Sequence, residues 1–99
     1  MNTPHSITVE REDDGTAGRY VMRYDDGSEG EMAYRHIRPG VISIYHTETP
    51  RQHRGGGGAL RMVERGIADA RAEGNKVQPL CSYVAAQFRR HPDWADLLA

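Results

Sequence analysis

Four consecutive glycines, residues 55–58, are the feature of this sequence best suited to binding a ligand. Glycine weakens helices and strands, but it adopts positive φ and lets the backbone lie directly against a bound molecule. A helix that begins immediately after such a segment offers unpaired N–H groups and the positive end of its dipole, which suit a phosphate or pyrophosphate. Because Arg51, His53 and Arg54 precede the glycines, we predict an anion site within residues 51–59.

Two familiar phosphate loops do not fit this segment. A Walker A loop requires a lysine and then a serine or threonine after its last glycine, whereas Ala59 and Leu60 stand there. A dinucleotide loop, Gly-x-Gly-x-x-Gly, would place its third glycine at Leu60 or Arg61, and no acidic residue follows at the end of a second parallel strand. ATP and dinucleotides are therefore disfavoured as ligands.

The chain before the glycines predicts an antiparallel sheet. Alternating side chains, such as Tyr20, Met22 and Tyr24 on one face, are typical of strands. Gly-containing turns at 12–15, 25–28 and 39–40 separate these segments. We predict a meander of four strands, at 7–10, 19–24, 31–37 and 41–47.

The apolar period then changes to that of a helix. Spacings of three and four residues from Gly58 onward define one apolar face, and charged residues occupy the other. Gly66 lies on the apolar face, where it would let the helix approach the sheet closely, and Gly74-Asn75 ends the helix. The predicted face comprises Ala59, Met62, Val63, Gly66, Ile67 and Ala70.

The C-terminal third predicts a fifth strand at 76–80, interrupted by Pro79, and a second helix capped by Ser82. A break at His91-Pro92 then precedes a last turn. A right-handed crossover would make the fourth and fifth strands parallel and would place a ligand at the carboxyl end of the fourth strand. The prediction is an α+β fold with a mixed sheet, and with Trp94, Leu97 and Leu98 in the core.

Several short motifs resemble those of one acyltransferase family. Residues 54–59 satisfy Arg/Gln-x-x-Gly-x-Gly/Ala between a strand and a helix, which resembles the acetyl-CoA pyrophosphate loop of the GCN5-related N-acetyltransferases. Residues 46–50 resemble the His-Thr-Glu-x-Pro segment of a compact subfamily, and Pro-Leu-Cys at 79–81, Val-Ala-Ala at 84–86 and Arg-Arg-His-Pro at 89–92 resemble its C-terminal signature. The resemblance covers residues 40–98 and implies a minimal form of that fold, in one domain of residues 1–99, with CoA or acetyl-CoA as ligand.

The resemblance also implies which residues meet the cofactor. Arg90 would reach the 3′-phosphate, although paired arginines late in a helix also complement its dipole in solvent. Two departures stand out, because relatives commonly have a bulky apolar residue at Gly58 and Pro-Phe at Ser82-Tyr83. The implied cofactor residues are Thr47, Glu48, Thr49, Arg54, Gly55, Gly56, Gly57, Gly58, Ala59, Tyr83 and Arg90.

Two side chains are candidates for catalysis. Cys81, just before a helix, could accept acetyl as a thiolate or transfer a proton to the CoA thiol, or it could be a small buried hydrophobe. His46 shares a strand face with Ile42 and Ile44 and could take a proton from an amine, or it could be a hydrogen-bonded core histidine. His53 and His91 are expected to face solvent or phosphate, and no zinc-ligand spacing predicts a metal.

Bulk composition narrows the function further. The chain has 99 residues, a formal net charge of -1 and a single cysteine, so we expect a cytoplasmic protein, a monomer or weak dimer, without nucleic-acid or membrane partners. The expected activity is acetyl transfer from acetyl-CoA to an amine acceptor that the sequence does not identify. The alternatives are a CoA-binding module with little catalysis, and an interaction domain whose glycines are only a linker.

Overall fold

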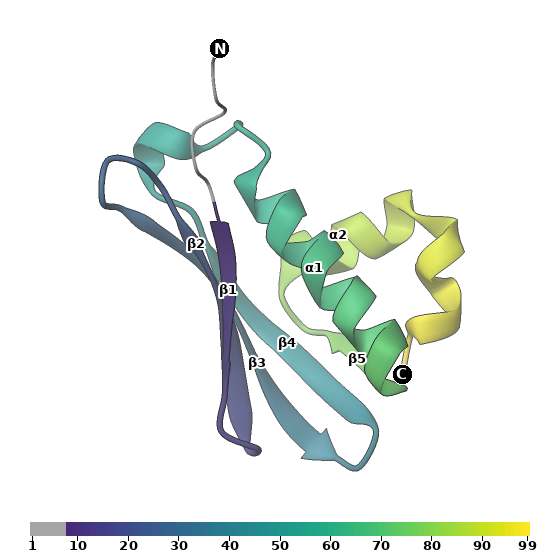
Figure 1. Ribbon diagram of the computed structural model, residues 1–99. Helices are drawn as coiled ribbons and strands as arrows, with labels where there is room; N and C mark the ends of the chain where they lie inside the picture. The colour runs from purple at the N-terminus through teal and green to yellow at the C-terminus, as the bar shows by residue number, and fades with distance from the viewer. Residues whose placement is uncertain (1–7) are drawn as a thin grey trace.

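The computed structural model describes residues 8–99 and contains one mixed sheet of five strands, in the order β1-β2-β3-β4-β5 (Figure 1). The first four strands pair antiparallel, and β5 pairs parallel to β4. The predicted α+β fold, a four-strand meander followed by a crossover to a parallel fifth strand, is confirmed. The strands are β1 (Thr8–Asp13), β2 (Ala17–Arg23), β3 (Glu29–Arg38), β4 (Val41–Glu48) and β5 (Lys76–Pro79).

Three of the helical segments lie on one side of this sheet: α1 (Gly58–Glu73), α2 (Ser82–Arg90) and the 3₁₀ segment η2 (Pro92–Leu97) (Figure 1). A short 3₁₀ turn, η1 (Arg51–His53), links β4 to the glycine segment. Gly74 ends α1 in the left-handed conformation, with φ 73°, as predicted. None of the helices in residues 8–99 is long and apolar enough to cross a membrane.

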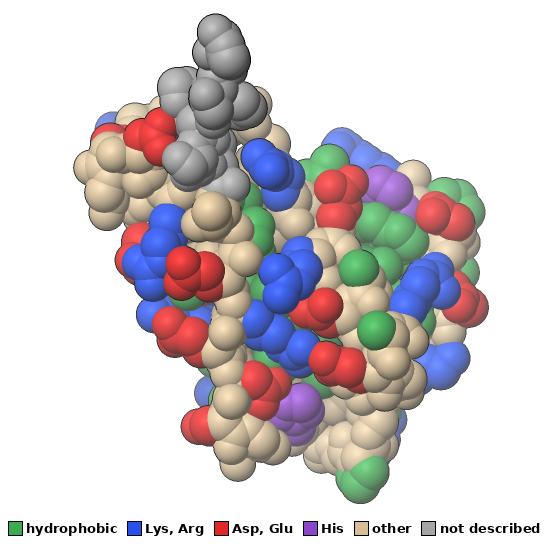
Figure 2. Space-filling view, in the orientation of Figure 1, with side chains coloured by type: hydrophobic (Ala, Val, Ile, Leu, Met, Phe, Trp, Pro, Cys, Tyr) green, Lys and Arg blue, Asp and Glu red, His purple; other side chains and the backbone are tan. Residues whose placement is uncertain are grey.

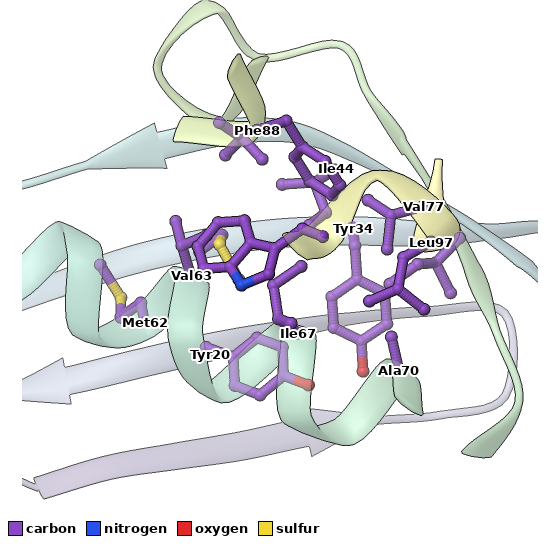
Figure 3. Packing of buried hydrophobic residues seen from close by; sticks show 14 of the residues in the cluster. Tyr20, Tyr34, Ile44, Met62, Val63, Ile67, Ala70, Val77, Phe88 and Leu97 are labelled. Carbon is purple, nitrogen blue, oxygen red and sulfur yellow. The ribbon is translucent and has the colours of Figure 1, made fainter. Parts of the chain in front are cut away.

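The core lies between the sheet and α1 (Figure 3). Met62, Val63 and Ile67 of α1 are buried, as the helical period predicts. Gly66 brings the helix close to the sheet, because a Cβ there would lie 2.9 Å from Met32 Cε. Trp94 and Leu97 are buried as predicted, and Val84 and Phe88 of α2 join the same cluster.

The opposite face of the sheet has no helix over it, yet Val21 is fully buried there. Neighbouring Tyr20 and Met22 point into the core, so the alternation of the strand places Val21 on the other side. Ion pairs across the strands cover this face with the aliphatic stems of long side chains. Arg19 pairs with Glu12 and Glu31, and Arg23 pairs with Glu10 and Glu29.

Basic and acidic side chains also alternate over β1 and the exposed side of α1 (Figure 2). Arg11 lies among Asp13, Asp69 and Glu73, with its guanidinium 3.5 Å from the Asp69 carboxylate. The electric fields of opposite charges placed this close together largely cancel farther from the surface. This side of the molecule therefore has no extended patch of one sign.

Several predicted boundaries and environments are wrong. The first strand continues through Glu12, which was expected in a turn, and Ile7 lies outside the described residues. Ser82 is the first residue of α2 rather than its cap, because Cys81 is the N-cap and provides no side-chain cap hydrogen bond. Leu98 is 44% exposed, since the chain extends there to form an isolated bridge with Val77 at the free edge of β5.

Among the glycines of the sheet, Gly18 has the least space for a side chain, and it therefore provides a stability test. A Cβ at Gly18 would lie 2.4 Å from the Tyr34 hydroxyl and 2.7 Å from the Glu12 carbonyl oxygen. We expect Gly18→Ala to lower the free energy of unfolding by about 1–3 kcal/mol, because backbone and a buried ring must both move. Urea denaturation measures this change. Gly66→Ala is the control, and its free energy of unfolding should remain within about 1 kcal/mol of the wild type. The new methyl group meets only the flexible end of Met32, and alanine has a higher helix propensity than glycine. Equal losses of stability in both variants would contradict the special steric role of Gly18.

Candidate cofactor-binding site

The site is created where β4 and β5 separate. Their parallel pairing ends at Ile44, whose carbonyl oxygen accepts hydrogen bonds from the N–H groups of both Leu80 and Cys81. At the next residue of β4, a register shift in its pairing with β3 leaves Tyr45 as an extra residue, so β4 bulges directly after its pairing with β5 ends. Beyond Ile44 the two chains diverge, and the edge of β4 facing β5 is free to pair with a ligand.

A cavity of about 580 Å³ extends from the end of β4 to the start of α1 and across to α2. Its lining includes every predicted cofactor residue except Gly56. Three residues that were not among the predicted cofactor residues also line it: His53, Leu60 and Gln87. The predicted residues in its lining are Thr47, Glu48, Thr49, Arg54, Gly55, Gly57, Gly58, Ala59, Tyr83 and Arg90.

The glycine segment forms the anion-binding end of this cavity. Gly55 and Gly57 have φ of 85° and 88°, which side chains rarely adopt, and so the chain can turn sharply from η1 into α1. Gly57 is the N-cap of α1 and provides no side-chain cap. The N–H groups of the first turn therefore lack the intrahelical partners that later residues have. This arrangement suits a phosphate group.

Polar and basic groups lie on both sides of that helix terminus. Arg54 is exposed, and its Nε donates to the Thr49 carbonyl oxygen at 3.4 Å. Tyr83, Gln87 and Arg90 reach the cavity from one face of α2, at spacings of four and three residues. The same helical spacing could have identified Gln87 from the sequence once Tyr83 and Arg90 were chosen.

Cys81 lies at the junction of β5 and α2, where its Sγ is 3.3 Å from Thr47 Oγ1. Burial of the thiol favours its neutral form. Hydrogen bonds from the Thr47 side chain and from the backbone at Val84 and Tyr83 outweigh this effect, so the pKa of Cys81 is lowered. Thr47 therefore connects the only cysteine of the chain to the cavity.

His46 is not a core histidine. Its side chain is 44% exposed, and its Nε2 lies 3.5 Å from the Glu48 carboxylate. The bulge at Tyr45 explains the difference, because it interrupts the alternation on which the shared face with Ile42 and Ile44 depended. Neither His46 nor Cys81 belongs to the lining of the cavity.

A second cavity, of about 400 Å³, lies on the other side of the glycine segment. Gly56 lines this cavity, together with Tyr24 and Asp26 near the β2–β3 turn. His53 stacks on Tyr24 with ring centroids 3.7 Å apart, and its Nε2 is 2.8 Å from Asp26 Oδ2. His53 also lines the larger cavity and its side chain is 28% exposed, so its expected contact with solvent or phosphate stays a prediction, while Tyr24 and Asp26 are partners that the sequence did not predict. His91 is likewise engaged, stacked on Trp94 with ring centroids 3.9 Å apart.

Residues 19–97 match the family model described as GCN5-related N-acetyl-transferase. The chain belongs to this family. Its fold is similar to that of a GCN5-like protein from Staphylococcus aureus solved by NMR, with a TM-score of 0.65, 17% sequence identity, and coverage of 91% of this chain and 87% of that chain. No curated protein matches the chain.

This domain of the GCN5-related N-acetyltransferase family thus has a cavity lined by most of the residues that the sequence predicts to meet a cofactor. At 17% identity the structural likeness shows the common fold alone. Within residues 8–99 no group of three or more His, Cys, Asp or Glu side chains could hold a metal ion. The lining of the cavity offers backbone groups of the glycine segment, Arg54 and Arg90, and Thr47, which contacts Cys81 outside the lining.

The environment of Cys81 predicts the pH dependence of its alkylation. The thiolate is the reactive form, and a lowered pKa places its formation at lower pH than for an ordinary cysteine. We expect the midpoint of iodoacetamide labelling to lie below the usual value of about 8.5. Thr47→Val should move it upward, because the thiolate then loses a hydrogen bond. Thr49→Val is the control, and an equal shift in both variants would contradict the role of Thr47.

Proposed function

We propose that this protein is an acetyl-CoA-dependent N-acetyltransferase. The observation that carries the proposal is the cavity at the divergence of β4 and β5, which gathers nearly all the residues that the sequence assigns to CoA. Family membership supports acyl transfer as the chemistry. The uncapped start of α1 supports an anionic ligand in this cavity.

The residues present fit CoA from end to end. N–H groups around residues 55–59 would receive the pyrophosphate, and Arg54 would add a charge-assisted contact. The free edge of β4 at Thr47, and Thr49 directly after the strand, would hydrogen-bond the amides of the pantetheine arm. Arg90 and Tyr83 would hold the nucleotide end from α2, with Arg90 directed to the 3′-phosphate.

Backbone groups would supply the main catalytic assistance. An N–H near the bulge, between Tyr45 and Thr47, would stabilise the negative charge that develops on the acetyl carbonyl oxygen. A neutral amine would attack the carbonyl carbon, the bond from that carbon to the CoA sulfur would break, and the amine nitrogen would lose one proton while the sulfur gains one. Half-exposed His46 is placed at the surface, where it would accept the proton of the incoming amine.

Cys81 offers a second route. Its thiolate would attack the same carbonyl carbon and release the CoA sulfur, and the amine would then take the acetyl group from Cys81. The lowered pKa and the contact with Thr47 favour a reactive thiol. Direct attack is ranked first because it requires only a bound cofactor and a neutral amine.

A CoA-binding module with little catalysis is the second candidate function. It is favoured by one specific observation, namely that neither Cys81 nor His46 lines the cavity. Both candidates require CoA binding. They differ in whether an amine is acetylated.

Thermal unfolding with CoA tests what the two candidates share. CoA at 100 times its dissociation constant should add about 2.7 kcal/mol to the free energy of unfolding. For a domain of this size that corresponds to a rise in Tm of roughly 10 °C or more. Pantetheine, which has no pyrophosphate, serves as the control ligand and should give a smaller shift. No shift at saturating CoA would exclude both candidates. If CoA does raise Tm, turnover of acetyl-CoA with a panel of amines distinguishes the two candidates.

Replacement of Cys81 distinguishes the two chemical routes. Under direct attack, Cys81→Ala should keep most of the rate of amine acetylation, because the thiol carries no acetyl group. Steady-state kinetics and intact-mass spectrometry after acetyl-CoA treatment measure the outcome. Near-complete loss of activity, with an acetyl group trapped on Cys81 in the wild type, would instead establish the covalent route.

A further inference from the structure

The hydroxyl of Tyr24 is a buried polar group without a partner. Tyr24 is only 9% exposed, and its hydroxyl oxygen has no hydrogen-bond partner among residues 8–99. Buried hydroxyls are normally paired, because an unpaired one loses its hydrogen bonds to water without replacement. Such a group at the edge of a candidate site indicates a partner that the protein alone does not provide.

This hydroxyl lies against the first residue of α1. A Cβ on Gly58 would be 2.1 Å from the Tyr24 hydroxyl oxygen, so the phenol occupies the space that a side chain at residue 58 would need. Gly58 lines both the larger cavity and the smaller one, and Tyr24 lines the smaller one. Only a glycine backbone therefore separates the hydroxyl from the anion-binding helix terminus.

The surrounding contacts fix the phenol in this orientation. Its ring is stacked on the His53 imidazole at an interplanar angle of 5°, and His53 is held in turn by Asp26. The nearby Arg61 is a cation, whereas the Asp26 carboxylate is occupied by His53, Gln52 and Ser28. Burial raises the pKa of Tyr24, so the hydroxyl keeps its proton and can donate it in a hydrogen bond.

We propose that the Tyr24 hydroxyl is an additional pyrophosphate-binding group, which donates a hydrogen bond to the anion when the glycine segment closes on it. The inference rests on the proposed function and names a side chain of the same site. Direct contact requires the segment to shift, because the hydroxyl is buried without ligand, and four glycines allow such a shift. It also accounts for glycine at residue 58, since any side chain there would separate the phenol from the anion.

Tyr24→Phe tests this proposal because it keeps the ring and its stack on His53 and removes only the hydroxyl. We expect CoA affinity to fall about tenfold, the effect of one lost hydrogen bond to a charged group. The Tm without ligand should be unchanged or higher, because an unpaired buried hydroxyl has been removed. Calorimetric titration measures the affinity of the variant for CoA and for pantetheine separately. The affinity for pantetheine, which has no pyrophosphate, should stay at the wild-type value.

Tyr20→Phe is the matched control on the same face of β2. Its hydroxyl is paired with Asp69 at 2.8 Å, so the loss should lower Tm and leave CoA affinity unchanged. If Tyr24→Phe binds CoA as tightly as the wild type, or weakens CoA and pantetheine equally, the proposal is overturned. If the wild-type protein does not bind CoA at all, the proposed function itself fails, which is a separate result.

Discussion

The termination of the β4–β5 pairing at Ile44 is the constraint on which the rest of the site depends. The Ile44 carbonyl oxygen accepts hydrogen bonds from the two residues that directly follow β5, Leu80 and Cys81, and the chains then diverge. Had the ladder continued, the edge of β4 at Thr47 would be occupied by β5 and no cavity would exist between the strands. The same divergence directs β5 into the start of α2, where the Cys81 thiol meets the Thr47 hydroxyl.

The glycine segment follows from a second constraint, the contact between β2 and the start of α1. Tyr24 fills the space beside Gly58, and the His53–Asp26 pair ties the β2–β3 turn to η1. A phenol supplied from the residue that follows β2 thus fills the space that a side chain at residue 58 would need. The glycines lose more conformational freedom on ordering than other residues would, and the stacked rings of Tyr24 and His53 offset part of that cost.

Local patterns predicted much of this molecule because they report one element at a time. The helical period from Gly58 onward identified the buried face of α1, and the glycine segment predicted one end of the cavity, whereas the family resemblance supplied more distant lining residues such as Tyr83. The errors arose where a distant contact decides the outcome. His46 was misplaced by a bulge that exists only through the register of β3 against β4, and the partners of His53, Tyr24 and Asp26, were missed because they are more than 25 residues away. Neither contact has a local signal in the sequence.

In the proposed function the cofactor is bound mainly by backbone groups, and this affects what the sequence reveals about the site. N–H groups at a helix terminus and the free edge of a strand recognise phosphate and amide groups through geometry, so the glycines and the strand pattern carry that information. An acceptor amine must instead be chosen by side chains, and the described residues near the strand divergence offer few of them: exposed Tyr45, half-exposed His46 and the Cys81–Thr47 pair. Tyr45 is also covered by the Arg35 guanidinium, 4.5 Å from its ring centroid. Under the proposed function, selectivity for the acceptor would therefore depend on a small number of side chains around the bulge, and it could change without disturbing the predicted cofactor cavity.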